Sequence, residues 1–253
     1  NERMRKYGLS FIKDIDLYNH VAEVVAAYSF NIDLRKFNEN LIDPIKLTFD
    51  SYVYNQTIKD TIEAEVIRQL DKTNSNTIGY FHQNIFKYIG VDWSVPQTGY
   101  DIVNSKQKIY CELKNKHNTM NSSSSAKTFM RMQSTLISDP SALCMLVEVI
   151  APHSRDIPWV VTLDGQKQEP NNNIRRVSID KLYSRVIGAD DAFLKLCEVL
   201  PVVISDVVRS KGSKVKQNSV MQELKGKSLD VLTSVYLLAF EKYEGFSNFK
   251  IKK

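Results

Sequence analysis

Gly99-Tyr100-Asp101 and, ten residues later, Glu112-Leu113-Lys114 form the stretch of this sequence that decides its fold. From residue 108 to residue 114, apolar and polar side chains alternate, with Ile109, Cys111 and Leu113 as the apolar members. A period of two residues is typical of a β-strand with one buried face. The strand therefore presents Glu112 and Lys114 side by side on its other face.

Asp101 is expected to face Glu112 across a hairpin. It starts a short apolar run, Ile102-Val103, and the next four residues, Asn104-Ser105-Lys106-Gln107, are polar enough to form a turn. An antiparallel pair closed by this turn brings residues 101 and 112 near each other. On composition alone, the alternative is an exposed hairpin with scattered charges.

A lone carboxylate followed by Glu-x-Lys is what Mg²⁺-dependent cutting of a phosphodiester requires. Asp101 and Glu112 offer oxygens to a hard cation that keeps most of its waters, and the Leu113 carbonyl is a further expected ligand. Such a cation lowers the pKa of a water molecule and stabilises the pentacoordinate phosphate. Lys114 is expected to orient that water and to offset the developing charge.

The segment after this strand has the composition of a surface that contacts DNA. Six basic residues and a single acid, Glu112, lie between Lys106 and Arg131. A local positive field over short polar side chains suits phosphate and base contacts. The candidate DNA-binding residues are Lys116, His117, Asn118, Asn121, Ser122, Ser123, Ser124, Lys127 and Arg131. The alternative is a polar loop that leads into a helix, with Ser125 or an earlier serine as N-cap.

These residues resemble a known nuclease motif. Asp101, Glu112-Leu113-Lys114 and the following Asn115-Lys116-His117-Asn118 are similar to the PD-(D/E)xK nuclease core, with Tyr100 in place of the usual proline. That proline supplies no ligand, so the chemistry is unaffected. Together with the upstream helix at residues 76–85, the motif resembles type II restriction endonucleases that cut GGNCC-like or GGWCC-like sites. The resemblance runs from about residue 43 to residue 201, and its specific part covers residues 77–125.

The resemblance implies an α/β fold in which a mixed central sheet is flanked by helices, with additional helices at both ends. Residues 1–253 would form a single nuclease domain, with a helical N-terminal elaboration at 1–71, the catalytic core at 72–165 and a mainly helical part at 166–253. Cleavage would leave 5′-phosphates. Related cores place a Glu or Gln near the metal-bound water, which makes Gln83 a further catalytic candidate, and Glu63 or Glu65 could assist the metal. A solvated helix face is the alternative for both glutamates, and Asp92 is a second candidate acid.

The composition of the whole chain agrees with an intracellular DNA-binding enzyme. It has 253 residues, a net charge of +5 and a pI of about 8.9. No apolar run reaches the length of a membrane span, and residues 1–6 are charged without the apolar core of a secretion signal. The three cysteines, at 111, 144 and 197, show no metal-binding spacing, so we expect them to pack as small apolar side chains in a reducing cytoplasm.

Periodicity predicts the remaining elements. Residues 142–150 are almost continuously apolar, which is typical of a central strand buried on both faces. A short edge-like strand is expected near residues 90–96 and another at 159–163. Helices are expected at residues 9–30, 45–54, 55–71, 77–88, 125–138 and 178–208, and from Ser219 to about residue 243. A turn and cap at 74–77 precedes the fourth of these, and breaks near Gly188 and Pro201 are expected in the sixth. A capping box at Ser219 starts the last. The last helix is apolar enough to be buried or to lie in a dimer interface.

Three functions remain open from the sequence alone. The first is a site-specific, Mg²⁺-dependent endonuclease for double-stranded DNA, acting as a homodimer because a palindromic site is cut on both strands. The second is a repair or recombination nuclease on the same core that recognises DNA structure. The third is a DNA-binding module with an inactive core, against which the intact Asp101, Glu112 and Lys114 argue. The basic stretch 209–216 is expected either to contact phosphates or to be a mobile surface loop.

Overall fold

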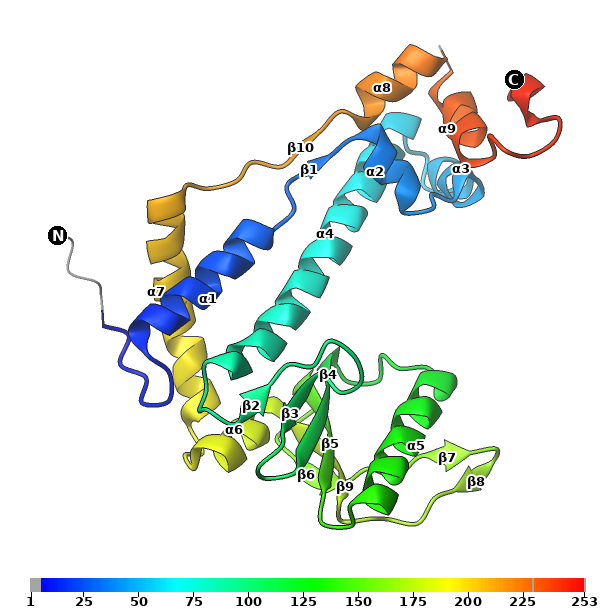
Figure 1. Ribbon diagram of the computed structural model, residues 1–253. Coiled ribbons are helices and arrows are strands. Elements are labelled where there is room, and N and C mark those ends of the chain that lie inside the picture. Colours follow the sequence, from blue (N-terminus) through cyan, green and yellow to red (C-terminus); the bar gives the residue numbers. More distant parts are fainter. Residues whose placement is uncertain (1–5, 229, 253) are drawn as a thin grey trace. The chain divides into compact units, whose positions relative to one another are not determined.

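The computed structural model describes residues 6–228 and 230–252, so most of the charged N-terminal run lies outside the described part. The chain forms two compact units (Figure 1). The first unit comprises residues up to Ala26 together with Ile78–Gly212, and the second comprises Ala27–Thr77 together with the residues from Ser213 onwards. Among the described residues, no helix has both the length and the apolar character needed to cross a membrane. The expected functional division at residues 71 and 165 stays a prediction.

A six-stranded mixed sheet forms the centre of the first unit, which confirms the predicted fold class. Its spatial order is β2-β3-β4-β5-β9-β6. The bounds are β2 Trp93–Ser94, β3 Ile102–Asn104, β4 Ile109–Lys116, β5 Leu143–Ile150, β9 Ile174–Ser178 and β6 Asp156–Pro158. Strands β2, β3 and β4 are antiparallel neighbours, β4, β5 and β9 run parallel, and β6 returns antiparallel at the far edge.

The predicted hairpin is confirmed as β3 and β4. Ile102 pairs with Cys111, and Asn104 pairs with Ile109. The turn closes because the Asn104 Oδ1 atom accepts a hydrogen bond of 2.9 Å from the Gln107 backbone N–H. Asn104 is 2% exposed, so the side chain that fixes the turn is itself shielded from competing water. The short strand predicted upstream of the hairpin is confirmed as the edge strand β2.

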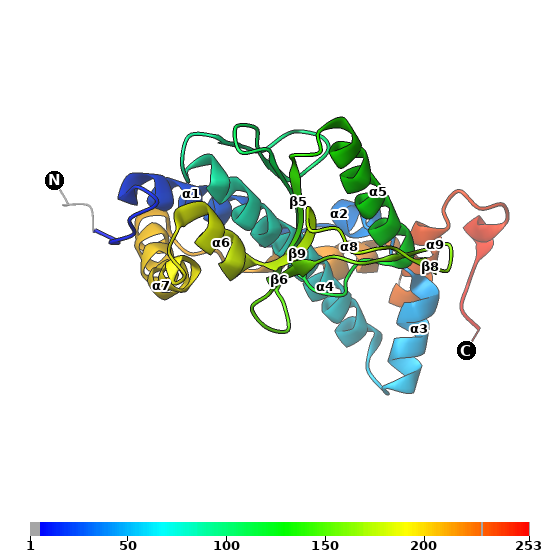
Figure 2. The same ribbon diagram turned by 90° about the horizontal axis from the view of Figure 1, so that it is seen from below.

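Strand β5 is buried on both faces, as its composition predicts. Met145 and Val147 face one core, and Cys144 and Leu146 face the other. Helix α5, Ser122–Ser138, covers one face of the sheet, while α6, Ile179–Ile187, and α7, Ala192–Lys211, cover the opposite face (Figure 1 and Figure 2). Glu112 lies on the face under α5, because it is two residues from Tyr110, which is partly buried and packs against the core on that face.

Further helical elements and a small hairpin complete the first unit, which also contains the end of helix α4, Ile58–Asn84. Helix α1, Asp14–Ala27, starts later than the expected residue 9, and the turn η1, Ile85–Lys87, packs with it in the core behind the sheet. The strand expected at 159–163 is shorter, as β7, Thr162–Leu163, pairs only with β8, Gln166–Lys167. Cys111 and Cys144 are buried as predicted, whereas Cys197 is exposed, which corrects its expected packing role.

The expected break at Gly188 is confirmed and the break at Pro201 is wrong. Gly188 ends α6 with a φ of 80°, in the left-handed region that glycine tolerates best. Pro201 lies inside α7, which continues to Lys211. Proline removes one backbone hydrogen bond, but Leu196 and Val203, on either side of it, are 1% and 0% exposed. Their burial against the core holds the helix together across the proline.

The second unit is mainly helical. Its helices are α2 Leu34–Glu39, α3 Pro44–Val53, α8 Val220–Lys227, α9 Val231–Ala239 and the first part of α4 Ile58–Asn84. A short parallel pair, β1 Asn31–Ile32 and β10 Gln217–Asn218, joins its two chain segments. The core of the unit gathers side chains from both segments, such as Phe37, Ile62 and Val235. A short turn, η2 Phe246–Asn248, follows α9.

Helix α4 is continuous through the turn and cap predicted at residues 74–77. Asn74 is buried, and its side chain accepts from the Ser29 N–H at 2.8 Å and donates to the Ser29 carbonyl at 3.1 Å. Because Asn74 is occupied by this tertiary contact, it does not cap a new helix. Thr77, the expected first residue of that helix, instead donates to the Thr73 carbonyl one turn earlier.

The single C-terminal helix expected to run from Ser219 to about 243 is two helices. Ser219 precedes α8, but its hydroxyl donates to Glu223 at 2.7 Å and makes no capping bond to the backbone, so the predicted capping box does not form. The chain leaves the helix at Ser228, whose backbone is extended, and α9 begins after Asp230. The predicted burial of this region is confirmed at Leu232 and its neighbours in α9.

Candidate active site

Asp101 is locked onto strand β4 by the backbone. Its N–H donates to the Cys111 carbonyl at 3.0 Å, and its Oδ2 atom accepts from the Leu113 N–H at 2.7 Å. These two bonds flank Glu112 in the sequence. The hairpin therefore brings the carboxylate of Asp101 to the strand position that carries the Glu-x-Lys, as predicted.

Glu112 is the centre of a small charged cluster. The Lys114 Nζ atom lies 3.5 Å from its Oε1 atom, and the Arg131 Nη1 atom lies 3.4 Å from its Oε2 atom. The Glu112 side chain is 13% exposed, against 34% for Lys114. Arg131 comes from α5, donates to the Gly99 carbonyl at 3.3 Å and lies over the Tyr100 ring. Tyr100, which stands where the motif usually has proline, thus packs against Arg131 of the site.

Burial raises the pKa of both carboxyl groups. For Asp101 this desolvation outweighs the Leu113 hydrogen bond and the charges of Lys114 and Arg131. For Glu112 burial is again the largest cause of the raised pKa, and the negative charge of Asp101 adds to it. Two partly buried carboxylates that oppose each other's ionisation form an environment that a cation stabilises.

The residues fit a magnesium ion. Within residues 6–228 and 230–252, no group of three or more His, Cys, Asp or Glu side chains gathers as a metal cage. Magnesium does not need one, because it is commonly held by one or two carboxylates and keeps several waters. Two carboxylates with the Leu113 carbonyl leave positions for such waters. The donor set, all oxygen, is the type a hard cation selects.

The predicted DNA-binding residues lie on β4, on the loop after it and on α5. Lys116 ends β4, and His117 and Asn118 lie in the loop. Asn121 is the N-cap of α5, since its Oδ1 atom accepts from the Ser124 N–H at 2.8 Å, which corrects the expected serine cap. Ser122, Ser123, Ser124 and Lys127 are exposed on the first turns of α5, whereas Arg131 is drawn to Glu112.

The auxiliary acids and Gln83 have separate surroundings. Glu65 is held by the Arg68 guanidinium at 2.6 Å, and Glu63 lies 4.0 Å from Lys59 on the helix surface. Asp92 lies 4.0 Å from Lys106. Gln83 is half-buried near the end of α4, in the same unit as Asp101, and among the hydrogen bonds of the described residues none joins it to the two carboxylates. Its catalytic role stays a prediction.

Sequence reasoning missed a second charged cluster on the same face of the sheet. Glu148 lies in β5, in register with Lys114, and its side chain is 2% exposed. Arg155 and Arg176 both bind it, at 2.7 Å and 2.8 Å. The signal was present, because Glu148 is the single acid in an otherwise apolar strand, and a charge in such a strand requires partners.

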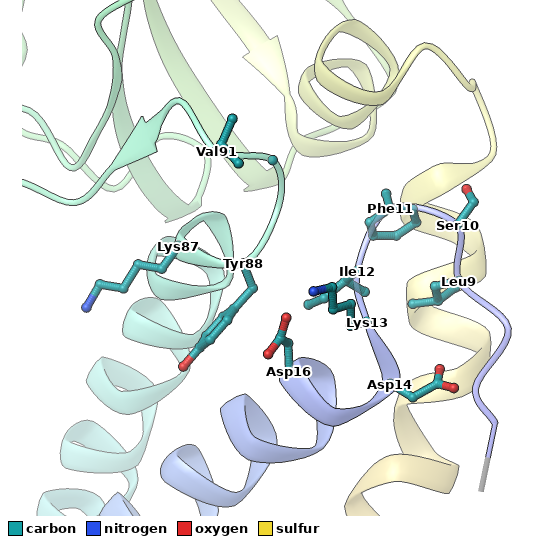
Figure 3. Close-up of a pocket in the computed structure, with 11 residues that line it drawn as sticks. Leu9, Ser10, Phe11, Ile12, Lys13, Asp14, Asp16, Lys87, Tyr88 and Val91 are labelled. Carbon is teal, nitrogen blue, oxygen red and sulfur yellow. The ribbon is translucent and has the colours of Figure 1, made fainter.

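The large cavity of the first unit lies away from this site. About 730 Å³ of space lies between the segment before α1 and the turn after η1, lined among others by Lys13, Asp16, Lys87 and Tyr88 (Figure 3). Its lining mixes charges of both signs and includes none of the predicted site residues. The chemistry is therefore located by the carboxylates and not by the size of a pocket.

A mixed sheet that brings two carboxylates and a lysine together at one hairpin is the arrangement of a PD-(D/E)xK-like nuclease core. The sequence matches the profile of the Eco47II restriction endonuclease family over residues 9–209. It is 30% identical over 239 residues to the type II restriction enzyme Sau96I of Staphylococcus aureus, covering 90% of this chain and 88% of that protein. It is 26% identical over 215 residues to the type II restriction enzyme Eco47II of Escherichia coli, covering 80% and 89%.

The chain belongs to the Eco47II restriction endonuclease family and is a type II restriction endonuclease, a hydrolase that acts on DNA. The resemblance predicted from the residues around Asp101 and Glu112 is thereby confirmed. Of the three functions left open by the sequence, the site-specific endonuclease is the one that the family supports, over the structure-selective repair nuclease and the inactive DNA-binding module.

Proposed function

We propose that this enzyme hydrolyses double-stranded DNA at a short palindromic site in a Mg²⁺-dependent reaction that leaves 5′-phosphates. The observation that carries the proposal is that two hydrogen bonds hold Asp101 at the Glu112-Leu113-Lys114 strand, one donated by its backbone N–H and one accepted by its carboxylate. A GGNCC-like recognition site is proposed from the resemblance to enzymes that cut such sites.

In this proposal each residue of the site has a separate role in catalysis. Asp101, Glu112 and the Leu113 carbonyl would hold Mg²⁺, which when bound lowers the pKa of water and neutralises charge on the phosphate. Lys114 orients the attacking water and offsets the charge that develops in the transition state. Arg131, paired with Glu112 at 3.4 Å, keeps this carboxylate in place and adds positive potential beside the phosphate.

The DNA lies, in this proposal, against the loop after β4 and the first turns of α5. The exposed Lys116 and Lys127 attract the phosphate backbone, and the serines at 122–124 offer short hydrogen-bonding groups. Cutting both strands of a palindromic site requires two active sites related by two-fold symmetry, so we propose a homodimer as the working form. Gln83 is kept as a candidate that helps to position the attacking water.

Removing the metal-binding and water-orienting groups tests the proposal. Asp101→Ala and Lys114→Ala are each expected to lower cleavage by a factor of about 10²–10³, because electrostatic groups of this kind contribute that much to catalysis. Both should still bind the specific DNA in Ca²⁺, which supports binding without turnover. The matched control is Lys106→Ala in the turn of the same hairpin, where the side chain is 77% exposed. Wild-type cleavage by either site variant, or a loss in the control, would contradict the assignment.

A further inference from the structure

A buried carboxylate with two arginines lies beside the catalytic lysine. Glu148 pairs in register with Lys114 across β4 and β5. The Arg176 guanidinium donates two hydrogen bonds to the Glu148 carboxylate, from Nε to Oε1 at 2.8 Å and from Nη2 to Oε2 at 2.8 Å. Arg155 adds a third bond of 2.7 Å to the Glu148 Oε1 atom. Two parallel N–H···O bonds are a geometry that arginine makes and lysine does not.

Arg176 also reaches the loop between β4 and α5. Its Nη2 atom donates to the Asn118 Oδ1 atom at 3.2 Å. Asn118 has a φ of 55°, in the left-handed region that asparagine tolerates better than most residues. The loop is further tied to the strand end, because the Thr119 hydroxyl donates to the Lys116 carbonyl at 2.8 Å. Glu148 thus holds Arg176, and Arg176 holds Asn118.

The space around this network is too small for a nucleotide. A cavity of about 90 Å³ is lined by Lys114, Asn118, Glu148 and Arg176, among others. A volume of this size takes a few ordered water molecules but no base. Arg176 is therefore not placed to receive a base in this cavity, and three of its hydrogen bonds are already made within the protein.

We propose that Arg176 is a positioning residue that sets the discrimination between the recognition sequence and sequences that differ from it by one base pair. It does so by fixing the loop at residues 117–121 through Asn118. The inference rests on the proposed function, in which this loop lies against DNA. It also changes the role of Asn118, which acts through Arg176 and not as a reader of bases.

The test compares cleavage of two short DNA duplexes, one with the recognition site and one with a single base pair of that site replaced. Arg176→Lys and Asn118→Gly are each expected to lower the ratio of the two kcat/KM values about tenfold. Arg176→Lys keeps the positive charge and loses the two parallel hydrogen bonds to Glu148. Asn118→Gly keeps the left-handed backbone and loses the side chain. The double variant should lose no more than either single variant, because both changes break one connection.

Arg175→Lys is the matched control. Arg175 is the adjacent residue of β9 and binds Asp156, so its substitution removes a comparable ion-pair geometry outside the loop network. It should lower the temperature of unfolding without changing the ratio. A wild-type ratio in Arg176→Lys, additive losses in the double variant, or an equal loss in Arg175→Lys would each overturn the proposal. A wild-type protein that cuts no DNA would overturn the proposed function and this inference with it. A wild-type protein that cuts at its site, with an unchanged ratio in Arg176→Lys, would overturn this inference alone.

An independent observation concerns one face of α3 in the second unit. Four large apolar side chains at helical spacing are exposed by half or more: Ile45 (52%), Phe49 (65%), Tyr52 (74%) and Val53 (69%). Residues at i, i+4, i+7 and i+8 lie on one face of a helix. The opposite face is used for packing, since Leu47 is 4% exposed.

The area of this face is close to what a protein interface requires. Leu41 and Tyr54, which flank α3 in the sequence, are also exposed, by 88% and 68%. Aromatic side chains carry on the order of 150–250 Å² each, so the three aromatic members alone expose roughly 400 Å². A standard interface buries about 800 Å² per partner, and apolar patches above a few hundred Å² mark interaction sites.

We infer that the α3 face, defined as these six residues, binds the same face of a second copy of this chain. A two-fold interface must be self-complementary. Lys46 and Asp50, which form an ion pair beside the apolar stripe, provide this, because antiparallel pairing of two α3 helices places each lysine near the partner's acid. The inference deepens the proposed cutting of both strands, which requires two catalytic units in one assembly.

Sedimentation velocity of the full chain over a wide range of concentration tests this without any cleavage assay. The wild-type protein is expected to be dimeric, and Phe49→Glu is expected to weaken the dimer at least tenfold. The control, Leu194→Glu, places the same charge on a helix residue that is 59% exposed outside the face. A monomeric wild-type protein, or an unchanged dimer in Phe49→Glu, would overturn the inference. A loss of DNA binding in Phe49→Glu with an unchanged dimer would also overturn the inference, because it would show that the α3 face binds DNA.

Discussion

Two glutamates on neighbouring strands show how surroundings decide the role of one residue type. Glu112 and Glu148 lie on the same face of the sheet, the first partly buried and the second fully buried. Burial and the charge of Asp101 raise the pKa of Glu112. Burial also acts to raise the pKa of Glu148, but hydrogen bonds from Arg176 and Arg155 outweigh it and lower that pKa. Lys114 and Arg131 therefore do not offset the burial of the first carboxylate and its repulsion by Asp101, whereas the two arginines do offset the burial of the second.

The same substitution at these two positions should change stability in opposite directions. The pKa of Glu112 is higher in the folded protein, so its ionisation costs stability as pH rises above the unfolded value. Glu112→Gln should then raise the free energy of unfolding at pH 7. The pKa of Glu148 is lower in the folded protein, so it contributes stability above the unfolded value, and that contribution is lost as pH falls through the folded value. Glu148→Gln should cost about 3 kcal/mol.

Urea unfolding at pH 7 measures both changes. The two variants share one chemical change and differ only in position. Glu112→Gln should also abolish cleavage, because it removes a proposed metal ligand. Greater stability together with lost activity is a common result at catalytic sites, which are often kept at a cost to stability. A destabilised Glu112→Gln would show that this carboxylate is a structural ion pair with Lys114 and Arg131 and not a ligand position.

At the scale of elements, Asn74 explains why α4 is a single helix. Asn74→Ala leaves the Ser29 N–H and carbonyl without their partners, which should lower the free energy of unfolding by about 1–3 kcal/mol. Asn76→Ala, two residues later on the exposed side, is the control and should change it by less than about 0.5 kcal/mol. Denaturant midpoints of the two variants decide the matter, and equal midpoints would mean that the Ser29 contact does not stabilise the helix.

The elements that the sequence predicts well are those with a local signal. The β3–β4 hairpin follows from alternation and a polar turn, and β5 follows from its continuous apolar run. The length of α4 could not be predicted in this way, because Asn74 and Ser29 are far apart in the sequence and no local pattern joins them. The helix through Pro201 has the same cause, since burial against distant residues overrides a local helix breaker.

The candidate site shows the same limit. Asp101, Glu112 and Lys114 were predicted because one hairpin contains all three. The Arg176 contact to Glu148 and Asn118 was missed because three separate segments contribute to it. Register between parallel strands is set by packing and crossover connections, which sequence periodicity does not report.

At the scale of the whole molecule, the two-unit division was also beyond local patterns. The second unit joins Asn31 to Gln217 in a parallel pair, across a separation that contains the whole Ile78–Gly212 segment of the first unit. Such a pairing produces no hydrophobic periodicity or motif in the sequence from which it could be predicted. The two segments are recognisable as partners only by their shared core, in which Phe37 and Val235 are both fully buried.

The stability of the molecule should fall in mild acid because of two buried histidines. Burial, with a contribution from His20, lowers the pKa of His82 to about 4 from the ordinary 6.5. Burial also lowers the pKa of His20, despite its contact to the Phe81 carbonyl. Both stay neutral in the folded protein while the unfolded chain takes up protons, so stability is lost as pH falls from about 6.5 towards 4. His82 alone should cost about 2 kcal/mol between pH 7 and pH 5.

Urea midpoints at pH 7 and pH 5 measure this loss. His82→Gln, which cannot titrate, should reduce the difference between the two pH values. His153→Gln, at an exposed position, should leave the difference unchanged. An equal pH dependence in the wild type and in His82→Gln would show that other groups cause the acid sensitivity.

The central claim is site-specific, Mg²⁺-dependent cleavage by the Asp101, Glu112 and Lys114 site. Incubation of the purified protein with a plasmid of known sequence, in Mg²⁺ or in EDTA, followed by sequencing of the fragment ends, tests it most directly. We predict discrete fragments in Mg²⁺ only, with a shared palindromic sequence at their ends and 5′-phosphates. Fragments without a common sequence, cutting that persists in EDTA, or no cutting in any divalent metal would contradict the claim.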